Sequence, residues 1–290
     1  MKLHVGVLHL PKAGATAAEY EDSFDCSVES GVAAVSDGAS NNFESRRWAS
    51  LLTHAFVHRP PPKFTPPKVL DWVESVAAEW SESIPWQDLT VFEEAKAALG
   101  SAATLVGLKF GSSSLRRAEG SWQCLAIGDS CLFQITRGQL VRSLPIAKSA
   151  DFDIHPSLLS TRLENSKLIA DRLITERGGW RAGDTFYLLT DAIASWFLLD
   201  FEQGGSPWET LSSLDEQSFA SFVEDKRARS LMRNDDVTVM TLSVRARSGT
   251  RRRQPLGTLA DASRRSSFHR ESLEEPLGIG PAATEGRRCL

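Results

Sequence analysis

The sequence predicts an α+β layered fold, and three observations support this prediction. Short apolar strand patterns open the chain, a helical region follows, and a long series of strands and turns comes after Gly100. Strands that follow one another in sequence, with the helices grouped apart from them, are typical of sheets covered by helices. The composition fits a folded chain of 290 residues, because 41% of them are hydrophobic and 24% are charged.

The first hundred residues contain two strand patterns and three helical patterns. The predicted strands cover residues 3–10 and 31–36, and the predicted helices cover 43–57, 68–82 and 88–99. The second strand ends at Asp37 and Gly38, and the prolines at 60–62 end the first helix.

The rest of the folded part is predicted to consist mostly of strands. The strands cover 104–110, 122–127, 131–135, 139–144, 168–175, 184–190 and 236–244, and the helices cover 191–199, 207–211 and 216–230. The first four of these strands are expected to pair consecutively as antiparallel neighbours, joined by short turns.

Residues 1–244 are predicted to form the domain, and residues 245–290 a disordered tail. The tail holds ten arginines and five acids, whereas the whole chain carries a formal charge of −4. A basic tail on an acidic chain makes nucleic acid an unexpected partner. We expect no membrane partner, because no apolar run approaches the roughly 18 residues that cross a bilayer. Four cysteines without a CxxC pair favour the reducing cytoplasm as location.

Acidic residues recur where the apolar strands begin or end. They are Glu21, Asp22, Asp37, Asp129, Asp191 and Asp235. Each one alone also fits a loop, a hairpin turn or a helix cap. Asp37 fits such a role least, because a carboxylate beside a buried strand is costly unless it is paired or bound to metal. Together these residues indicate carboxylates that converge at one rim of a sheet on hard cations, and oxygen ligands suit Mg²⁺ and Mn²⁺.

Six segments carry a resemblance to a known family. They read EYEDSF (19–24), AVSDGAS (34–40), GSAATLVGL (100–108), AIGDSCLFQI (126–135), YLLTDAIASWF (187–197) and RNDDVTVMTL (233–242). In this order they resemble the motifs of the metal-dependent protein phosphatases, the protein phosphatase 2C or PPM type, over residues 1–244. The resemblance implies a four-layer αββα sandwich of two antiparallel sheets flanked by helices, with a metal centre at one end.

The resemblance also implies a role for each acid. Asp37 matches the aspartate that bridges two Mg or Mn ions, and Gly38 matches the glycine whose carbonyl completes one metal's shell. Asp191 and Asp235 match the aspartates that hold the other metal, so these two and Asp37 are the expected catalytic residues.

Four further positions complete the match. Glu21 corresponds to an acid that binds metal through water, and Asp22 to its neighbour. Asp129, with Asp191, matches residues that hold a third, weaker ion in some members of the family. Thr104 matches a structural strand residue.

The implied reaction is hydrolysis of phosphoserine and phosphothreonine on proteins by a hydroxide that bridges two metal ions. A phosphorylated protein is the implied substrate, and a cognate Ser/Thr kinase is a further partner. Ala17 stands where the family often has a phosphate-holding arginine, for which Lys12 is a candidate substitute. Ala39 stands where it often has a histidine. Two alternatives therefore stay open: a weak or inactive relative that binds phosphoproteins and regulates a partner, and a two-metal phosphatase of small phosphoesters.

Overall fold

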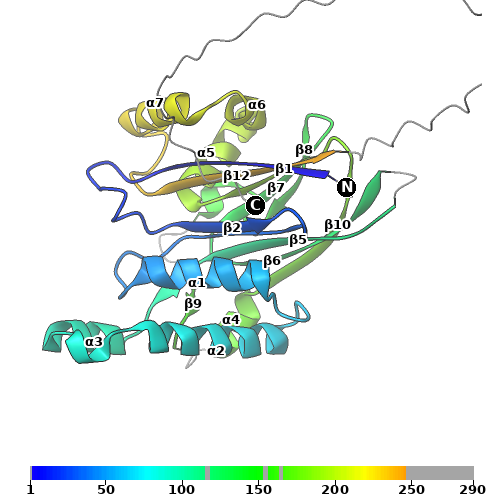
Figure 1. Cartoon of the computed structure of the whole chain (residues 1–290). Helices are drawn as coiled ribbons and strands as arrows, with labels where there is room; N and C mark the ends of the chain where they lie inside the picture. Colours follow the sequence, from blue (N-terminus) through cyan, green and yellow to red (C-terminus); the bar gives the residue numbers. More distant parts are fainter. Residues whose placement is uncertain (1, 115–117, 153–155, 163–165, 246–290) are drawn as a thin grey trace, which may run out of the picture. The chain divides into compact units, whose positions relative to one another are not determined.

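Two five-stranded antiparallel sheets make up the centre of the molecule (Figure 1). The computed structural model describes residues 2–114, 118–152, 156–162 and 166–245. One sheet has the order β1 (Lys2–Leu10), β12 (Val237–Arg245), β11 (Thr185–Leu189), β7 (Cys131–Thr136), β8 (Gln139–Leu144). The other has the order β10 (Ile174–Arg181), β6 (Glu119–Ile127), β5 (Leu105–Ser114), β3 (Val32–Ser36), β2 (Ser23–Ser27). A small third sheet pairs β4 (Ala102–Ala103) with β9 (Leu159–Ser160).

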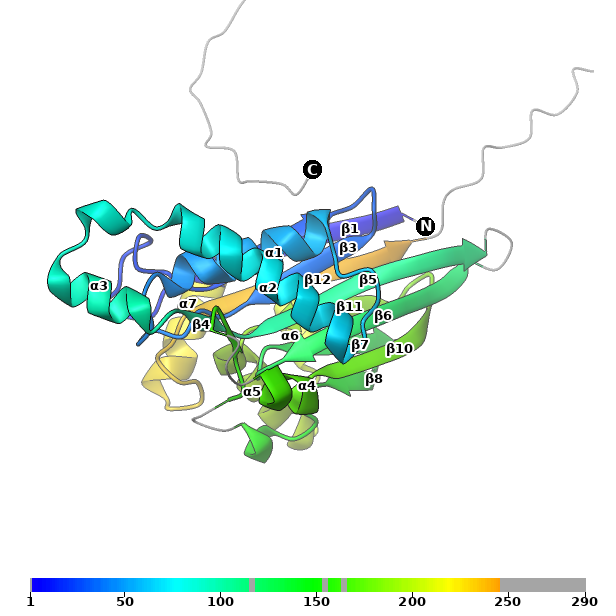
Figure 2. The same ribbon diagram turned by 90° about the horizontal axis from the view of Figure 1, so that it is seen from below.

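Helices cover the outer faces of both sheets. The β3 side carries α1 (Ser45–His58), α2 (Pro66–Ser83), α3 (Val91–Ala98) and α4 (Ser166–Arg172). Figure 2 shows α1 and α2 lying over the sheet that contains β3 and β5. The β12 side carries α5 (Asp191–Glu202), α6 (Pro207–Ser212) and α7 (Glu216–Ala228). Two short 3₁₀ turns, η1 (Trp86–Asp88) and η2 (Ser149–Asp151), complete the elements.

Three hydrophobic cores separate the four layers. The first packs Trp48, Leu52 and Phe56 of α1 against the β3 sheet, the second lies between the sheets, and the third packs α5 to α7 against the β12 sheet. Strand β3 contributes to two of these cores, with Val32 and Ala34 facing α1 and the alternate residues Ala33 and Val35 facing the other sheet. Burial on both faces explains why this strand is apolar throughout. The predicted four-layer αββα sandwich is confirmed.

Two local structures differ from the predictions. Residues 166–172 form α4, and the strand starts only at Ile174, so the strand predicted over 168–175 is wrong for most of its length. Ile169 and Leu173 lie four residues apart and both pack on the core beneath α2, a spacing that suits a helix. Strand β2 was not predicted, because its sequence SFDCS is only five residues long and contains only two apolar residues.

The connection between β6 and β7 also differs from the expectation. The sequence predicted a hairpin at Gly128–Ser130, but β6 and β7 belong to different sheets. The segment is therefore a crossing between the two layers, which places Asp129 at the end of the sandwich.

Two further predictions concern membranes and the C-terminal tail. Among the helices of the described ranges, none combines the length and apolar character that crossing a bilayer requires. Residues 246–290 of the predicted tail lie outside the described residues, and the boundary at 244/245 stays a prediction.

Candidate active site

Antiparallel pairing brings the acid-bearing strand ends together at one end of the sandwich. In one sheet Leu189 pairs with both Cys131 and Val239, and in the other Ser23 pairs with Ser36. The acids lie within two residues of the ends of these strands: Glu21, Asp22, Asp37, Asp129, Asp191 and Asp235. The sequence predicted convergence at the rim of one sheet, whereas both sheets contribute to this cluster.

Asp37, directly after β3, lies at the centre of this acid cluster. Burial raises its pKa well above the usual range, and the charges of Asp22, Asp191, Asp235 and Asp129 raise it further. Like charges have this effect only at short range, so the five carboxylates are close neighbours. Such a group remains ionised at neutral pH only if positive charge compensates it.

Three buried carboxylate oxygens have no hydrogen-bond partner within the described part of the chain. They are the Oδ1 atoms of Asp22, Asp129 and Asp191. Burial and the charge of Asp191 raise the pKa of Asp129 to about 7. Burial and the charge of Asp235 raise the pKa of Asp191 to about 6. Buried polar atoms are normally bonded, so these free oxygens and raised pKa values fit residues that hold a hard divalent cation.

Gly38 occupies a position where a side chain does not fit. A Cβ there would lie 2.8 Å from the backbone oxygen of Glu21 and 2.9 Å from the backbone carbonyl atoms of Ser45. Gly38 also forms an isolated bridge with Ala103. The close approach of these backbones requires glycine and keeps the main chain of Gly38 beside the acid cluster.

Glu21 has polar partners on both carboxylate oxygens. Oε1 accepts a hydrogen bond from Ser45 Oγ at 2.6 Å. Oε2 accepts one from Lys12 Nζ at 3.0 Å and another from Ser40 Oγ. Burial alone would raise the pKa of Glu21, but the hydrogen bonds from Ser40, Ser45 and Lys12 lower it overall. Lys12, the candidate phosphate-binding residue, therefore lies at the edge of the acid cluster and is paired with Glu21.

Asp22 connects the two sheets. Its Oδ2 accepts hydrogen bonds from Thr190 Oγ1 at 3.0 Å and from Thr238 Oγ1 at 2.7 Å. Thr190 directly follows β11 and Thr238 belongs to β12, and both strands are part of the opposite sheet. The Tyr20 hydroxyl bonds to Thr238 as well. Asp22 thus fixes the spacing of the layers that carry the other acids.

Thr104 fixes the backbone of Asp37. Its Oγ1 accepts from Asp37 N at 2.9 Å and shares a 2.6 Å hydrogen bond with Ser130 Oγ. Thr104 N donates in turn to Asp37 O at 2.8 Å. These contacts are structural, as the resemblance implied, and they join β3 to the crossing that holds Asp129.

Sequence reasoning missed two residues of the last motif. Asp236 accepts from Lys12 N at 2.8 Å through Oδ1 and from Glu21 N at 2.7 Å through Oδ2, so it holds two loops beside the cluster. Arg233 Nη1 lies 3.3 Å from Asp191 Oδ2. The position of Arg233 two residues before Asp235 is the signal that could have indicated it.

Ala17 and Ala39, which stand where the family often has an arginine and a histidine, add no chemistry to the cluster. Ala17 is exposed in the loop before Glu21. Ala39 follows Gly38, and its backbone N–H donates to Ala102 O at 3.0 Å. Neither alanine side chain can bind phosphate or transfer a proton.

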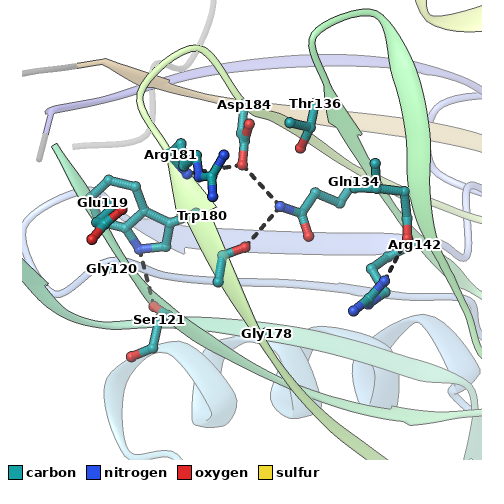
Figure 3. Close-up of a pocket in the computed structure, with 12 residues that line it drawn as sticks. Glu119, Gly120, Ser121, Gln134, Thr136, Arg142, Gly178, Trp180, Arg181 and Asp184 are labelled. Carbon is teal, nitrogen blue, oxygen red and sulfur yellow. Dashed lines mark hydrogen bonds between the residues drawn. The ribbon is translucent and has the colours of Figure 1, made fainter. Parts of the chain in front are cut away.

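A cavity of about 780 Å³ lies near the other end of the strands (Figure 3). Gln134, Trp180 and Asp184 line it, and β7 runs about 15–20 Å from the acid cluster toward it. Gln134 Nε2 donates to Gly179 O and to Asp184 Oδ2, both at 2.9 Å, and Trp180 Nε1 donates to Ser121 O at 3.1 Å. These buried polar groups have partners, so the unsatisfied acid cluster is the better candidate site.

The αββα sandwich with an acid cluster at one end defines a class of metal-dependent phosphatases. The chain belongs to the protein phosphatase 2C family, whose family model matches residues 16–238. A comparison with curated proteins finds no similar sequence.

Several solved structures are similar in fold. One is the serine/threonine phosphatase PstP/Ppp of Mycobacterium tuberculosis, at 16% identity over 84% of this chain and 100% of that chain, with a TM-score of 0.55. Another is the photosystem II phosphatase PBCP, at 16% identity over 84% and 99%, with a TM-score of 0.53. A third is the PstP catalytic domain in complex with two manganese ions, at 16% identity over 84% and 99%, with a TM-score of 0.50. At these identities the likeness shows the fold.

Proposed function

We propose that this chain hydrolyses phosphoserine and phosphothreonine on proteins with the help of bound divalent cations. The observation that carries the proposal is the group of unpartnered, buried carboxylate oxygens around Asp37. Such a group stays ionised in a folded protein only if something compensates its charge, and hard cations do so through oxygen ligands. Family membership supports phosphate ester chemistry at such a centre.

The proposed ligands are the acids predicted from the sequence. Asp37 with the carbonyl of Gly38, and Asp191 with Asp235, would hold two Mg²⁺ or Mn²⁺ ions. Glu21, beside Asp22, would bind through water, and Asp129 would help to hold a third, weaker ion. The structure of the PstP catalytic domain in complex with two manganese ions supports two as the number of metal ions. Bound in this way, the ions would supply an activated water nucleophile at neutral pH and charge for the phosphoryl oxygens.

Two cations of this chain can bind the substrate phosphate. Lys12 Nζ lies 3.0 Å from Glu21 Oε2, and Arg233 Nη1 lies 3.3 Å from Asp191 Oδ2. The arginine presents a planar fork to two phosphate oxygens, whereas the lysine acts as a point charge. In the proposal these two residues take over the role of the arginine that is absent at Ala17.

The alternatives differ in substrate and in turnover. Ala17 and Ala39 favour a binding module that recognises phosphoproteins without hydrolysing them. A phosphatase of small phosphoesters would use the same acids. A Ser/Thr kinase that produces the substrate, and a cytoplasmic location, belong to the proposal for the protein phosphatase.

The proposal is tested by hydrolysis of p-nitrophenyl phosphate and of a phosphothreonine peptide, with and without Mn²⁺. We expect Mn²⁺-dependent turnover of both, which Asp37→Asn reduces at least a hundredfold. Asp184→Asn is the matched control, since Asp184 is also buried but lies in the cavity away from the acid cluster. Turnover of the small ester alone would favour the metabolite phosphatase, and no turnover above Asp37→Asn would favour the binding module.

A further inference from the structure

Three side chains outside the acid cluster meet where β2 packs against α1. Asp25 Oδ2 lies 3.3 Å from His54 Nδ1 and 3.2 Å from His58 Nε2. The centroids of the two imidazole rings are 4.3 Å apart. One ligand atom from each residue lies within 4.8 Å of the others, so the three can share one ion.

The local fold explains why these side chains converge. His54 and His58 are four residues apart on α1 and therefore lie on the same face of the helix, one turn apart. Ser23 Oγ of β2 bonds to Thr53 Oγ1 of α1 at 3.0 Å, which joins the strand to the helix. Asp25 Oδ1 accepts from Cys26 N at 2.7 Å, so the other oxygen of this carboxylate is free to face the histidines.

The distances suit tetrahedral coordination. Zn²⁺ binds histidine nitrogen and carboxylate oxygen at about 2.0–2.2 Å, which places neighbouring ligand atoms of a tetrahedron about 3.3–3.5 Å apart. The two Asp25 distances, 3.2 and 3.3 Å, are close to that edge length. His54 and His58 have side chains 62% and 51% exposed, so an ion can reach the nitrogens from solvent.

We propose that Asp25, His54 and His58 form a binding site for a transition metal ion, with Zn²⁺ as the principal candidate and water as the fourth ligand. Imidazole with one carboxylate selects borderline metals, whereas the acid cluster offers only oxygen and selects Mg²⁺ or Mn²⁺. The two sites are separate, because His54 lies nine positions along α1 from Ser45, a rise of about 13 Å.

The ion would join α1 to β2. Ser45 at the start of α1 bonds to Glu21, and β2 begins directly after Asp22. Binding would therefore stabilise the two elements that frame one side of the acid cluster, and it requires no activity at that cluster.

An alternative arrangement has both rings donating N–H groups to Asp25 without any ion. In that arrangement the ring nitrogens that face Asp25 carry protons, whereas in the proposed site they bind the ion.

Nitrogen NMR of the histidine rings distinguishes the metal-bound arrangement from the metal-free one. The full chain is labelled with ¹⁵N-histidine, kept in excess Mg²⁺ to occupy the acid cluster, and titrated with Zn²⁺. We expect one equivalent to shift Nδ1 of His54 and Nε2 of His58 and to leave the exposed His4 of β1 unchanged. A titration in which His54 and His58 keep their signals, or shift only in step with His4, overturns the proposal.

Variants provide a second, independent readout. At a hundredfold excess of Zn²⁺ over its dissociation constant, the wild-type melting temperature should rise by about 5 °C or more. His54→Ala and His58→Ala should abolish that rise, whereas the control His4→Ala and the acid-cluster variant Asp37→Asn should retain it. An equal rise in His54→Ala and the wild type contradicts the site, and loss of the rise in Asp37→Asn assigns the Zn²⁺ to the acid cluster and also overturns it.

Discussion

Buried carboxylates of the acid cluster whose pKa values are raised oppose folding once they ionise, unless cations compensate their charge. Asp129 is buried, and its pKa of about 7 lies well above the usual value near 4, so the folded state binds its proton more tightly than the unfolded state does. Its contribution to stability is fully present below about pH 4 and is lost as the pH rises through about 7. The same sign holds for Asp191, whose pKa is raised to about 6.

Replacing Asp129 by asparagine should therefore stabilise the metal-free protein at high pH. At pH 8 we expect the free energy of unfolding to increase by about 1–3 kcal/mol, with little change at pH 4. Urea denaturation with a chelator present measures both values. The control Asp184→Asn should lose stability, because that carboxylate accepts bonds from Gln134 and from Arg181 N. A less stable Asp129→Asn at pH 8 would contradict this view of the cluster.

Gly38 supports a second prediction at this scale. Gly38→Ala should destabilise the protein by about 1–3 kcal/mol, because the new Cβ meets backbone atoms of Glu21 and Ser45 that cannot move freely. Gly6→Ala on β1 is the control, since a Cβ there meets nothing within 4 Å, and its effect should stay within about 0.5 kcal/mol. Equal melting temperatures of Gly38→Ala and Gly6→Ala would show that the close backbone approach at Gly38 is not maintained.

Sequence reasoning identified single residues unevenly. Asp37 stood out because a carboxylate next to a buried apolar strand is costly unless it is paired or bound to metal. Arg233 and Ser45 did not stand out, because their importance comes from contacts with Asp191 and Glu21 that are distant in the chain. Short polar loops give no periodicity from which such contacts could be predicted.

At the scale of elements, the connections between strands decide where the acids lie. Strands were predictable from apolar alternation, but the crossing at Gly128–Ser130 was not, because a short turn looks alike within a hairpin and between sheets. Thr104 stabilises this crossing through Ser130 and holds Asp37 from the other side. The junction thus joins the end of β3 to the start of β7.

Thr104→Val should loosen that junction. The valine keeps the shape but leaves the Asp37 N–H and the buried Ser130 hydroxyl without this partner, which costs about 1–3 kcal/mol. Thr241→Val, half-buried in the middle of β12, is the matched control and should change stability by less than about 0.5 kcal/mol. Faster amide exchange at Asp37 only in Thr104→Val would confirm the role, and unchanged exchange there would refute it.

At the scale of the whole molecule, antiparallel pairing makes one end of the sandwich acidic. Both sheets deliver strand ends there, and Asp22 bonds across the layers to Thr190 and Thr238. The layered fold was predictable because the order of strands and helices limits the arrangements that bury both sheets. That both sheets would share the site was not predictable from the individual strands.

The stability of the whole domain should depend jointly on pH and on cations. Because Asp129 and Asp191 have raised pKa values, the melting temperature of the metal-free protein should fall between about pH 5 and pH 8. Added Mn²⁺ should raise it more at pH 8 than at pH 5, since protons compete for the same oxygens. Differential scanning calorimetry at both pH values tests this. An Mn²⁺-induced rise in melting temperature that is larger at pH 5 than at pH 8 would refute the prediction.

Titration calorimetry of Mn²⁺ tests the central claim most directly, because the claim concerns what the acid cluster binds rather than what it hydrolyses. The wild type should bind about two ions, Asp37→Asn should lose this binding, and Asp184→Asn, with its buried carboxylate already bonded to Gln134, should retain it. Binding of Mn²⁺ to Asp37→Asn with the same stoichiometry and affinity as to the wild type would contradict the claim.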